Sequence, residues 1–107
     1  MNDADAIAAF GALAQDHRLA TLRQLVRAGK TGMAAGAIAE AIGLAPSSLS
    51  FHLAQLSQAG LVTQERQHRT IIYRADFAAI QTLVGYLLEN CCEADSCTAD
   101  PTKEISA

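Results

Sequence analysis

The hydrophobic period of the chain changes at Gly60, and this change limits the possible folds more than any other feature of the sequence. Between residues 49 and 56, leucines recur at helical spacing. Beyond the glycine, residues 61–66 and 69–74 are rich in Val, Thr, Ile and Tyr, which favours two strands joined by a turn at residues 67–68. The sequence therefore predicts a helix followed directly by a β-hairpin.

Four more helices are expected from apolar residues at helical spacing. Asp16 is expected to cap the second helix and Asp76 the last one. Gly43 suits a left-handed C-cap of the third helix, over residues 34–42, and Pro46 suits the first position of the fourth. The expected apolar faces are Ile7, Phe10, Leu13 and Ala14 in the first helix, Leu19, Leu22, Leu25 and Val26 in the second, Ile38, Ala41 and Ile42 in the third, and Phe77, Ile80, Val84, Leu87 and Cys91 in the last.

Two short helices joined by a tight turn and followed by a hairpin make a winged helix-turn-helix, a mainly α fold with a β-hairpin wing. A chain of 107 residues is long enough for one such domain and too short for two. We expect a domain for DNA binding and dimerisation over residues 1–90, and a cysteine-containing sensor tail over residues 91–107. The acidic start lacks a signal peptide, and no apolar run approaches the ~18 residues of a membrane span, so a cytoplasmic protein is expected.

The charge of the chain is unevenly distributed. The net charge is −3, which argues against nucleic-acid binding when it is taken alone. Between residues 15 and 74, however, seven basic residues stand against three acidic ones. Phosphates respond to the charge within a Debye length of about 8–10 Å, so this basic centre favours binding to DNA.

The helix over residues 46–59 carries the side chains expected to read DNA. Small polar residues near its N-terminus can approach base edges, and an exposed aromatic side chain can contact a thymine methyl group. Arginines at a wing tip can grip phosphates or enter a narrow minor groove. The alternatives are a helix cap at Ser47, solvated serines and arginines, and a histidine that satisfies a local carbonyl instead of a phosphate. The candidate DNA-binding residues are Ser47, Ser48, Ser50, Phe51, His52, Arg66 and Arg69.

Residues 44–62 hold the run S-x-H-L-x-x-L-x-x-A-G-L-V, followed by Arg66, Arg69 and Tyr73. This stretch resembles the ArsR/SmtB family of metal-responsive repressors, and the similarity extends over residues 7–92. The resemblance implies a homodimer formed by the first and last helices, which binds a palindromic operator and leaves it when an inducer binds. Two positions depart from the family pattern: Phe51 stands where many members have a polar residue, and His68 stands where the wing often has Gly.

Three cysteines, Cys91, Cys92 and Cys97, lie within seven residues of each other and are the only ones in the chain. Soft thiolates select soft ions, and the spacing matches no zinc signature. Three thiols without a fourth ligand suit trivalent arsenic or antimony, which form three-coordinate pyramids. Adjacent cysteines on a helix point about 100° apart, so the end of the helix would have to unwind to close such a site.

The resemblance bears on the sensor as well. Founding arsenic-responsive members carry a Cys-x-Cys pair where this chain has Ala34 and Gly36, and the zinc-responsive pattern needs histidines that do not occur after His68. Some members hold arsenic with a Cys-Cys pair at the end of the last helix and a third cysteine shortly after it. Cys91, Cys92 and Cys97 are similar to that variant.

The expected function is therefore a repressor of a metalloid-resistance operon, released from double-stranded operator DNA by arsenite or by antimonite. Three alternatives remain for the cysteines: a thiol switch that senses oxidants or persulfides, a cadmium or lead site completed by an outside ligand, and a small apolar Cys91 beside incidental thiols. An enzyme is not expected, because the sequence shows no nucleophile–base constellation and no phosphate-binding loop. No organic cofactor or substrate and no membrane partner are expected either.

Overall fold

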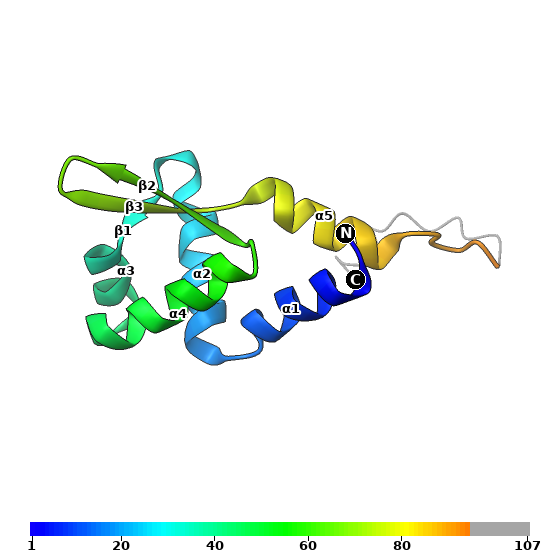
Figure 1. The fold of residues 1–107 in the computed structure, drawn as a ribbon, viewed down its shortest axis with the longest axis horizontal. Coiled ribbons are helices and arrows are strands. Elements are labelled where there is room, and N and C mark those ends of the chain that lie inside the picture. Colours follow the sequence, from blue (N-terminus) through cyan, green and yellow to red (C-terminus); the bar gives the residue numbers. More distant parts are fainter. Residues whose placement is uncertain (95–107) are drawn as a thin grey trace.

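The computed structural model describes residues 1–94 of the chain. Within them, the segments with helical and strand spacing fold into five α-helices and a small antiparallel sheet (Figure 1). This is the predicted winged helix-turn-helix, in which α3 and α4 precede a hairpin wing. The elements are α1 (Asp3–Leu13), α2 (Asp16–Ala28), the 3-10 helix η1 (Gly29–Thr31), β1 (Met33–Ala34), α3 (Ala35–Ile42), α4 (Pro46–Gln58), β2 (Val62–Gln67), β3 (Thr70–Ala75) and α5 (Phe77–Leu88).

The helix caps follow the predicted positions with one exception. Gly43 adopts the left-handed conformation after α3, Pro46 opens α4, and the side chain of Asp76 accepts a hydrogen bond of 3.0 Å from a backbone N–H of α5. The expected cap at Asp16 is wrong, because Asp16 is already helical and the side chain of Gln15 accepts from the N–H of Arg18 at 3.0 Å. The longer glutamine side chain reaches the same orphan donor one residue earlier.

The wing is a regular hairpin whose turn lies one residue later than predicted. The strands β2 and β3 pair from Val62 with Ala75 to Gln67 with Thr70. Gln67 therefore belongs to the strand, and the two turn residues are His68 and Arg69. His68 has a φ of 58°, a conformation that glycine adopts without steric cost.

The sheet has a third strand that the sequence did not predict. β1 pairs with β3, so the strand order is β1-β3-β2 and the segment just before α3 is hydrogen-bonded to the wing. Gly32 makes this approach possible, because its φ is 69° and a Cβ there would lie 2.5 Å from the carbonyl oxygen of Tyr73. The strand takes one residue from the expected helix, so α3 begins at Ala35 rather than at Ala34.

The core lies between α2, α3, α4 and the first residues after α4, where large apolar side chains are fully buried. α1 contributes only alanines to this core, and α5 contributes one leucine. The helices α1 and α5 contact each other at the end of the molecule away from α3 and the wing (Figure 1). The buried apolar residues are Ala6, Ala9, Ala12, Leu22, Leu25, Ile38, Ala39, Leu49, Leu53, Leu56, Leu61, Val62, Ala75 and Leu83.

The predicted apolar faces of α1 and α5 are largely open to solvent within one chain. Ile7 is 70% exposed and Leu87 is 59% exposed. The reason is packing: α1 meets the core through small residues on another side, and α5 lies along α1 rather than over the core. Exposed large apolar residues on these two helices are Ile7, Phe10, Phe77, Val84, Leu87 and Leu88, and Leu19 and Val26 of the stripe expected in α2 are exposed as well.

The last helix ends at Leu88, so the expectation that Cys91 lies on its face is wrong. Residues 89–94 form turns, and Asn90 and Cys92 have positive φ values of 60° and 62°. These turns already separate the two adjacent cysteines from helical geometry, so no unwinding is needed there. No helix within residues 1–94 is both long and apolar enough to cross a membrane.

Candidate nucleic-acid interface

The helix α4 presents the predicted serines on its open face. Ser47, Ser48 and Ser50 are exposed, and Phe51 beside them is 58% exposed. The opposite face is anchored by three buried leucines at positions 49, 53 and 56. At 100° per residue, Ser47 and Phe51 lie roughly opposite the leucines, and Ser48 and Ser50 lie about 100° from Leu49, at the two edges of the open face.

The alternative that Ser47 caps α4 is not supported by the geometry. The N-cap is Ala45, which makes no side-chain capping bond, and Pro46 removes one of the orphan donors at the first helical position. The first turn of α4 therefore leaves its remaining orphan N–H groups directed outward next to Ser47 and Ser48, and such a helix N-terminus attracts anions.

The wing carries its positive charge near the tip. Arg66 and Arg69 flank His68, and the Nε of Arg66 donates to the carbonyl oxygen of His68 at 3.4 Å. Glu65 is the one acidic residue between 62 and 75, and Nη1 of Arg74 donates to its carboxylate at 2.8 Å. This hydrogen bond lowers the pKa of Glu65. Because Arg74 compensates this carboxylate, the two tip arginines define the charge that a DNA backbone would meet.

A groove of about 300 Å³ lies between α4 and the wing. It was not predicted, because it forms from residues of two elements whose relative angle no sequence pattern gives. Its walls carry hydroxyl and amide groups that can donate and accept hydrogen bonds. The lining residues are Ser50, Leu53, Ala54, Ser57, Gln58, Gln64 and Tyr73.

His52 differs from the other candidates, because its side chain is half-buried against α2. Its Nδ1 lies 3.4 Å from Nη1 of Arg18, and its ring lies 5.7 Å from the ring of His17. Burial, together with the positive charge of Arg18 and of His17, lowers the pKa of His52. The histidine thus has protein partners on one edge, and its contact with DNA stays a prediction.

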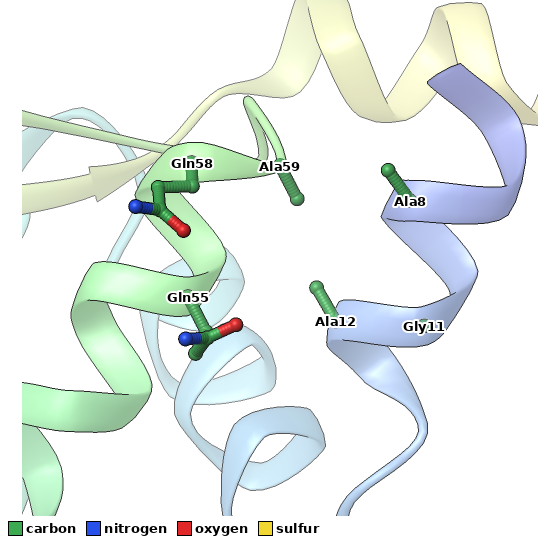
Figure 2. A pocket seen from close by; sticks show the side chains of 6 residues that line it. All are labelled: Ala8, Gly11, Ala12, Gln55, Gln58 and Ala59. Carbon is green, nitrogen blue, oxygen red and sulfur yellow. The ribbon is translucent and has the colours of Figure 1, made fainter. Parts of the chain in front are cut away.

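A second pocket, of about 250 Å³, separates α1 from α4 and offers no catalytic chemistry. Figure 2 shows Ala8 and Ala12 of α1 facing Gln55, Gln58 and Ala59 across it. Two amides are the only polar side chains among the residues that line it. None of these groups can act as an acid, a base or a nucleophile at neutral pH.

The two described cysteines lie together just beyond α5. Their sulfurs are 3.4 Å apart, and Cys91 is an exposed free thiol. Cys97, the third predicted ligand, lies outside the described residues. Within residues 1–94, no group of three His, Cys, Asp or Glu side chains is arranged to hold a metal ion.

Comparison with known proteins gives the family of the chain. A helix-turn-helix domain model matches residues 13–65. The nodulation protein NolR of Rhizobium meliloti is 40% identical over 86 residues, which cover 79% of this chain and 68% of NolR.

Two solved structures share the fold. An ArsR-like transcriptional regulator from Rhodococcus superposes with a TM-score of 0.75 at 23% identity, covering 96% of this chain and 88% of that one. A homodimeric winged helix-turn-helix DNA-binding domain from Mycobacterium bovis, described as a possible ArsR-family regulator, gives a TM-score of 0.65 at 27% identity and covers 92% and 97% of the two chains. The chain belongs to the ArsR family of winged helix-turn-helix transcriptional regulators, which are DNA-binding proteins.

Proposed function

We propose that this regulator is a homodimeric repressor of a metalloid-resistance operon, and that trivalent arsenic releases it from its operator by binding Cys91, Cys92 and Cys97. The observation that carries the proposal is the pair of sulfurs 3.4 Å apart directly after α5. With metal–sulfur bonds of about 2.3 Å, two sulfurs on one ion lie at most about 4.6 Å apart, so the pair is close enough to share an ion.

The DNA contacts of this proposal follow from the exposed face of α4 and from the wing. The N-terminal turn of α4 enters the major groove, where Ser47, Ser48 and Ser50 approach base edges and Phe51 meets a thymine methyl group. Arg66 and Arg69 hold the backbone or the minor groove beside it. The serines and the phenylalanine would thus select sequence, and the arginines would supply affinity and register.

The dimer of this proposal covers the exposed apolar side chains of α1 and α5. A contiguous apolar surface of this kind is rare on a monomer and marks an interaction site. Ile7 and Phe10 of α1 line a shallow pocket with Tyr86 of α5, so the two helices form one surface. The homodimeric Mycobacterium bovis domain supports this assembly. Two recognition helices would then read half-sites about 34–36 Å apart.

The inducer signal would run from the cysteines along the whole of α5 to its N-terminal end, which adjoins the wing and the end of α4. Asp76 alone separates the wing strand β3 from α5. Its N–H donates to the carbonyl oxygen of Leu61 at 2.9 Å, close behind α4, and its carboxylate caps α5. A shift of α5 therefore reaches both the wing and the end of α4. A coupling free energy of about 1–3 kcal/mol, typical of allostery, would weaken operator binding about 5- to 150-fold.

Arsenite titration of an operator complex tests the proposal. The fully reduced protein is bound to a labelled fragment from the region upstream of its own gene, and fluorescence anisotropy follows release by arsenite, antimonite, zinc, cadmium, lead and peroxide. The matched control replaces the three cysteines by serine. Release of the wild type by arsenite, with the control still bound, supports the sensor. Release by cadmium or lead alone would replace arsenic by a thiophilic divalent cation.

A thiol redox switch is the second candidate, and one observation favours it. Cys92 is disulfide-bonded, whereas Cys91 is a free thiol. Oxidation of two thiols to a disulfide removes two electrons and two protons, and peroxide accepts them to form water. Arsenic needs the reduced thiolates, so the two candidates separate in one experiment. Release by peroxide, reversal by a dithiol reductant and no response to arsenite would make the protein a redox regulator.

In vitro transcription from the same upstream region gives the direction of regulation. A repressor lowers transcript yield when it binds, and arsenite restores the yield. An increase in transcript on binding would make the protein an activator and would leave the DNA-binding part of the proposal intact.

A further inference from the structure

Arg18 joins two helices that no other described side-chain hydrogen bond connects. Its Nε donates to the carbonyl oxygen of Ala12, near the end of α1, at 2.6 Å. Its Nη1 lies 3.4 Å from Nδ1 of His52, which lies 34 residues further along the chain on the recognition helix α4. The guanidinium of α2 thus bridges the proposed dimerisation helix and the proposed reading helix.

The end of α1 needs a donor of this kind. The carbonyl of Ala12 is among the last four of the helix and has no partner within it. The last turn of α1 carries no basic residue that could balance the negative end of its dipole. Arg18 supplies both the missing donor and the positive charge. Its own position is fixed because its backbone N–H donates to the side chain of Gln15 at 3.0 Å.

The contact with His52 depends on the protonation of that histidine. A guanidinium has only donors, so Nδ1 of His52 must accept, and it can accept only while it carries no proton. Protonation would remove the acceptor and place a second positive charge next to Arg18. The ring of His17 lies 5.7 Å away, tilted by 40°, and would add a third charge if it were protonated as well.

The charged groups that face His52 all come from α2. They are Arg18 and His17, and both disfavour the protonated imidazole. The helices α1 and α3 and the strand β2 also pack against α4, and within residues 1–94 they contribute no charged group that shifts the pKa of His52. Burial acts in the same direction, so the pKa of His52 lies below its usual value of 6.5.

We propose that Arg18 is a positioning residue that sets the recognition helix on α1, and that protonation of His52 breaks this link and weakens operator binding. The inference rests on the operator binding proposed above and adds to it a contact between two helices that depends on pH. The neutral pair contributes fully above pH 6.5, since a group with a lowered pKa in the folded state loses its contribution as the pH falls through that lowered value.

The direction of the pH effect distinguishes the link between Arg18 and His52 from a direct contact between a histidine and phosphate. Added positive charge near DNA strengthens the attraction to phosphates, so a histidine that contacted phosphate would tighten binding on acidification. The link between Arg18 and His52 predicts the opposite: acidification should weaken binding to the operator. Loss of one hydrogen bond corresponds to a change of about three- to tenfold in the operator dissociation constant between pH 7.5 and a pH below the pKa of His52.

Operator affinity measured against pH tests the proposal with matched variants. His52→Asn keeps an acceptor near the place of Nδ1 and does not titrate, so its dissociation constant should stay within about twofold of its own pH 7.5 value. His68→Asn, at the wing tip, should lose operator affinity on acidification to the same extent as the wild type. Arg18→Lys keeps the charge but offers one head group for two acceptors, and should bind the operator more weakly at pH 7.5 with a flatter pH profile.

Nuclear magnetic resonance of the histidine side chains gives a readout without DNA. His52 should titrate below 6.5 with Nδ1 unprotonated in the wild type, and its pKa should rise in Arg18→Gln, which removes the positive charge beside it. Operator binding that strengthens or stays constant as the wild type is acidified through the pKa of His52 would overturn the proposal, as would an unchanged pKa in the glutamine variant. A protein that binds no operator at pH 7.5 would instead refute the proposed function, and the resonance experiment would still decide the link.

Discussion

The two halves of the molecule differ in how far they bury the apolar faces of their helices. In the half formed by α2, α3 and α4, apolar side chains at helical spacing meet each other, and Leu53 is 2% exposed. In the half formed by α1 and α5, side chains at the same spacing point outward, and Leu87 is 59% exposed. An apolar stripe therefore indicates that a helix face will be covered, and it does not say by which chain. The first half buries most of its apolar residues within one chain, with Leu19 and Val26 of α2 as exceptions, and the second leaves most of its large apolar residues exposed.

The largest effect that would test this contrast comes from Leu53→Ala. Removing a fully buried leucine costs about 2–5 kcal/mol of the free energy of unfolding, because the transfer energy is lost and a cavity remains. Urea unfolding followed by circular dichroism measures it. The matched variant Leu87→Ala should cost less than about 1 kcal/mol at low protein concentration, where the monomer dominates. Equal costs at every concentration would mean that α5 is packed as tightly as α4 within one chain.

A charge on the open half gives the next largest effect. Leu87→Asp should shift the protein toward the monomer and weaken operator binding by at least about tenfold, since an unpaired charge is costly in an apolar interface. Sedimentation velocity and anisotropy measure the two changes.

The control for that variant lies on the other half of the molecule. Phe51→Ala removes a comparably exposed apolar side chain from α4, and it should weaken operator binding without changing the mass of the assembly. A dimer that survived Leu87→Asp would move the interface away from α5.

Removing a charge from the wing should have a smaller effect, on the salt dependence of DNA binding. Arg69→Ala should lower the slope of log binding constant against log salt by about one unit, because one phosphate contact is lost. Ser50→Ala is the matched control: it should reduce operator binding more than binding to random DNA and leave the slope unchanged. Identical slopes for the wild type and Arg69→Ala would remove this arginine from the interface.

The smallest effect concerns the turn of the wing. His68→Gly should raise the free energy of unfolding by a few tenths of a kcal/mol, because glycine relieves the positive φ but also gains entropy in the unfolded chain. Thermal unfolding of the two proteins side by side measures the difference. A loss of stability above about 1 kcal/mol would show that the histidine side chain makes contacts that outweigh its backbone strain.

The helices were predictable because apolar residues at helical spacing and capping residues mark them in the sequence. Gly43 and Pro46 mark the turn between α3 and α4 by steric rules that hold in any context. The strand β1 was missed because two residues show no period, and its partner β3 lies about 40 residues further along the chain. The wing turn was displaced by one residue because neither His68 nor its neighbours carries the glycine or asparagine that usually marks such a turn.

The candidate interface was predictable only where one helix carries it. The outward positions of Ser47 and Phe51 follow from the placement of three buried leucines. The link from Arg18 to His52 joins residues 34 positions apart on two helices, and no local pattern encodes it. The position of Cys91 was misjudged for a related reason: the apolar spacing continues past Leu88, whereas the backbone leaves the helix there.

The end of α5 at Leu88 has a consequence for how such regulators diversify. Within the described residues, no side chain after Leu88 is buried, so residues 89–94 hold their shape without contributing to the core. Evolution, or a designer of biosensors, can therefore replace the side chains in this segment at little cost to folding. If the cysteines bind the inducer as proposed, a different donor set grafted after Leu88 should change which inducer is detected and leave the recognised operator as it was.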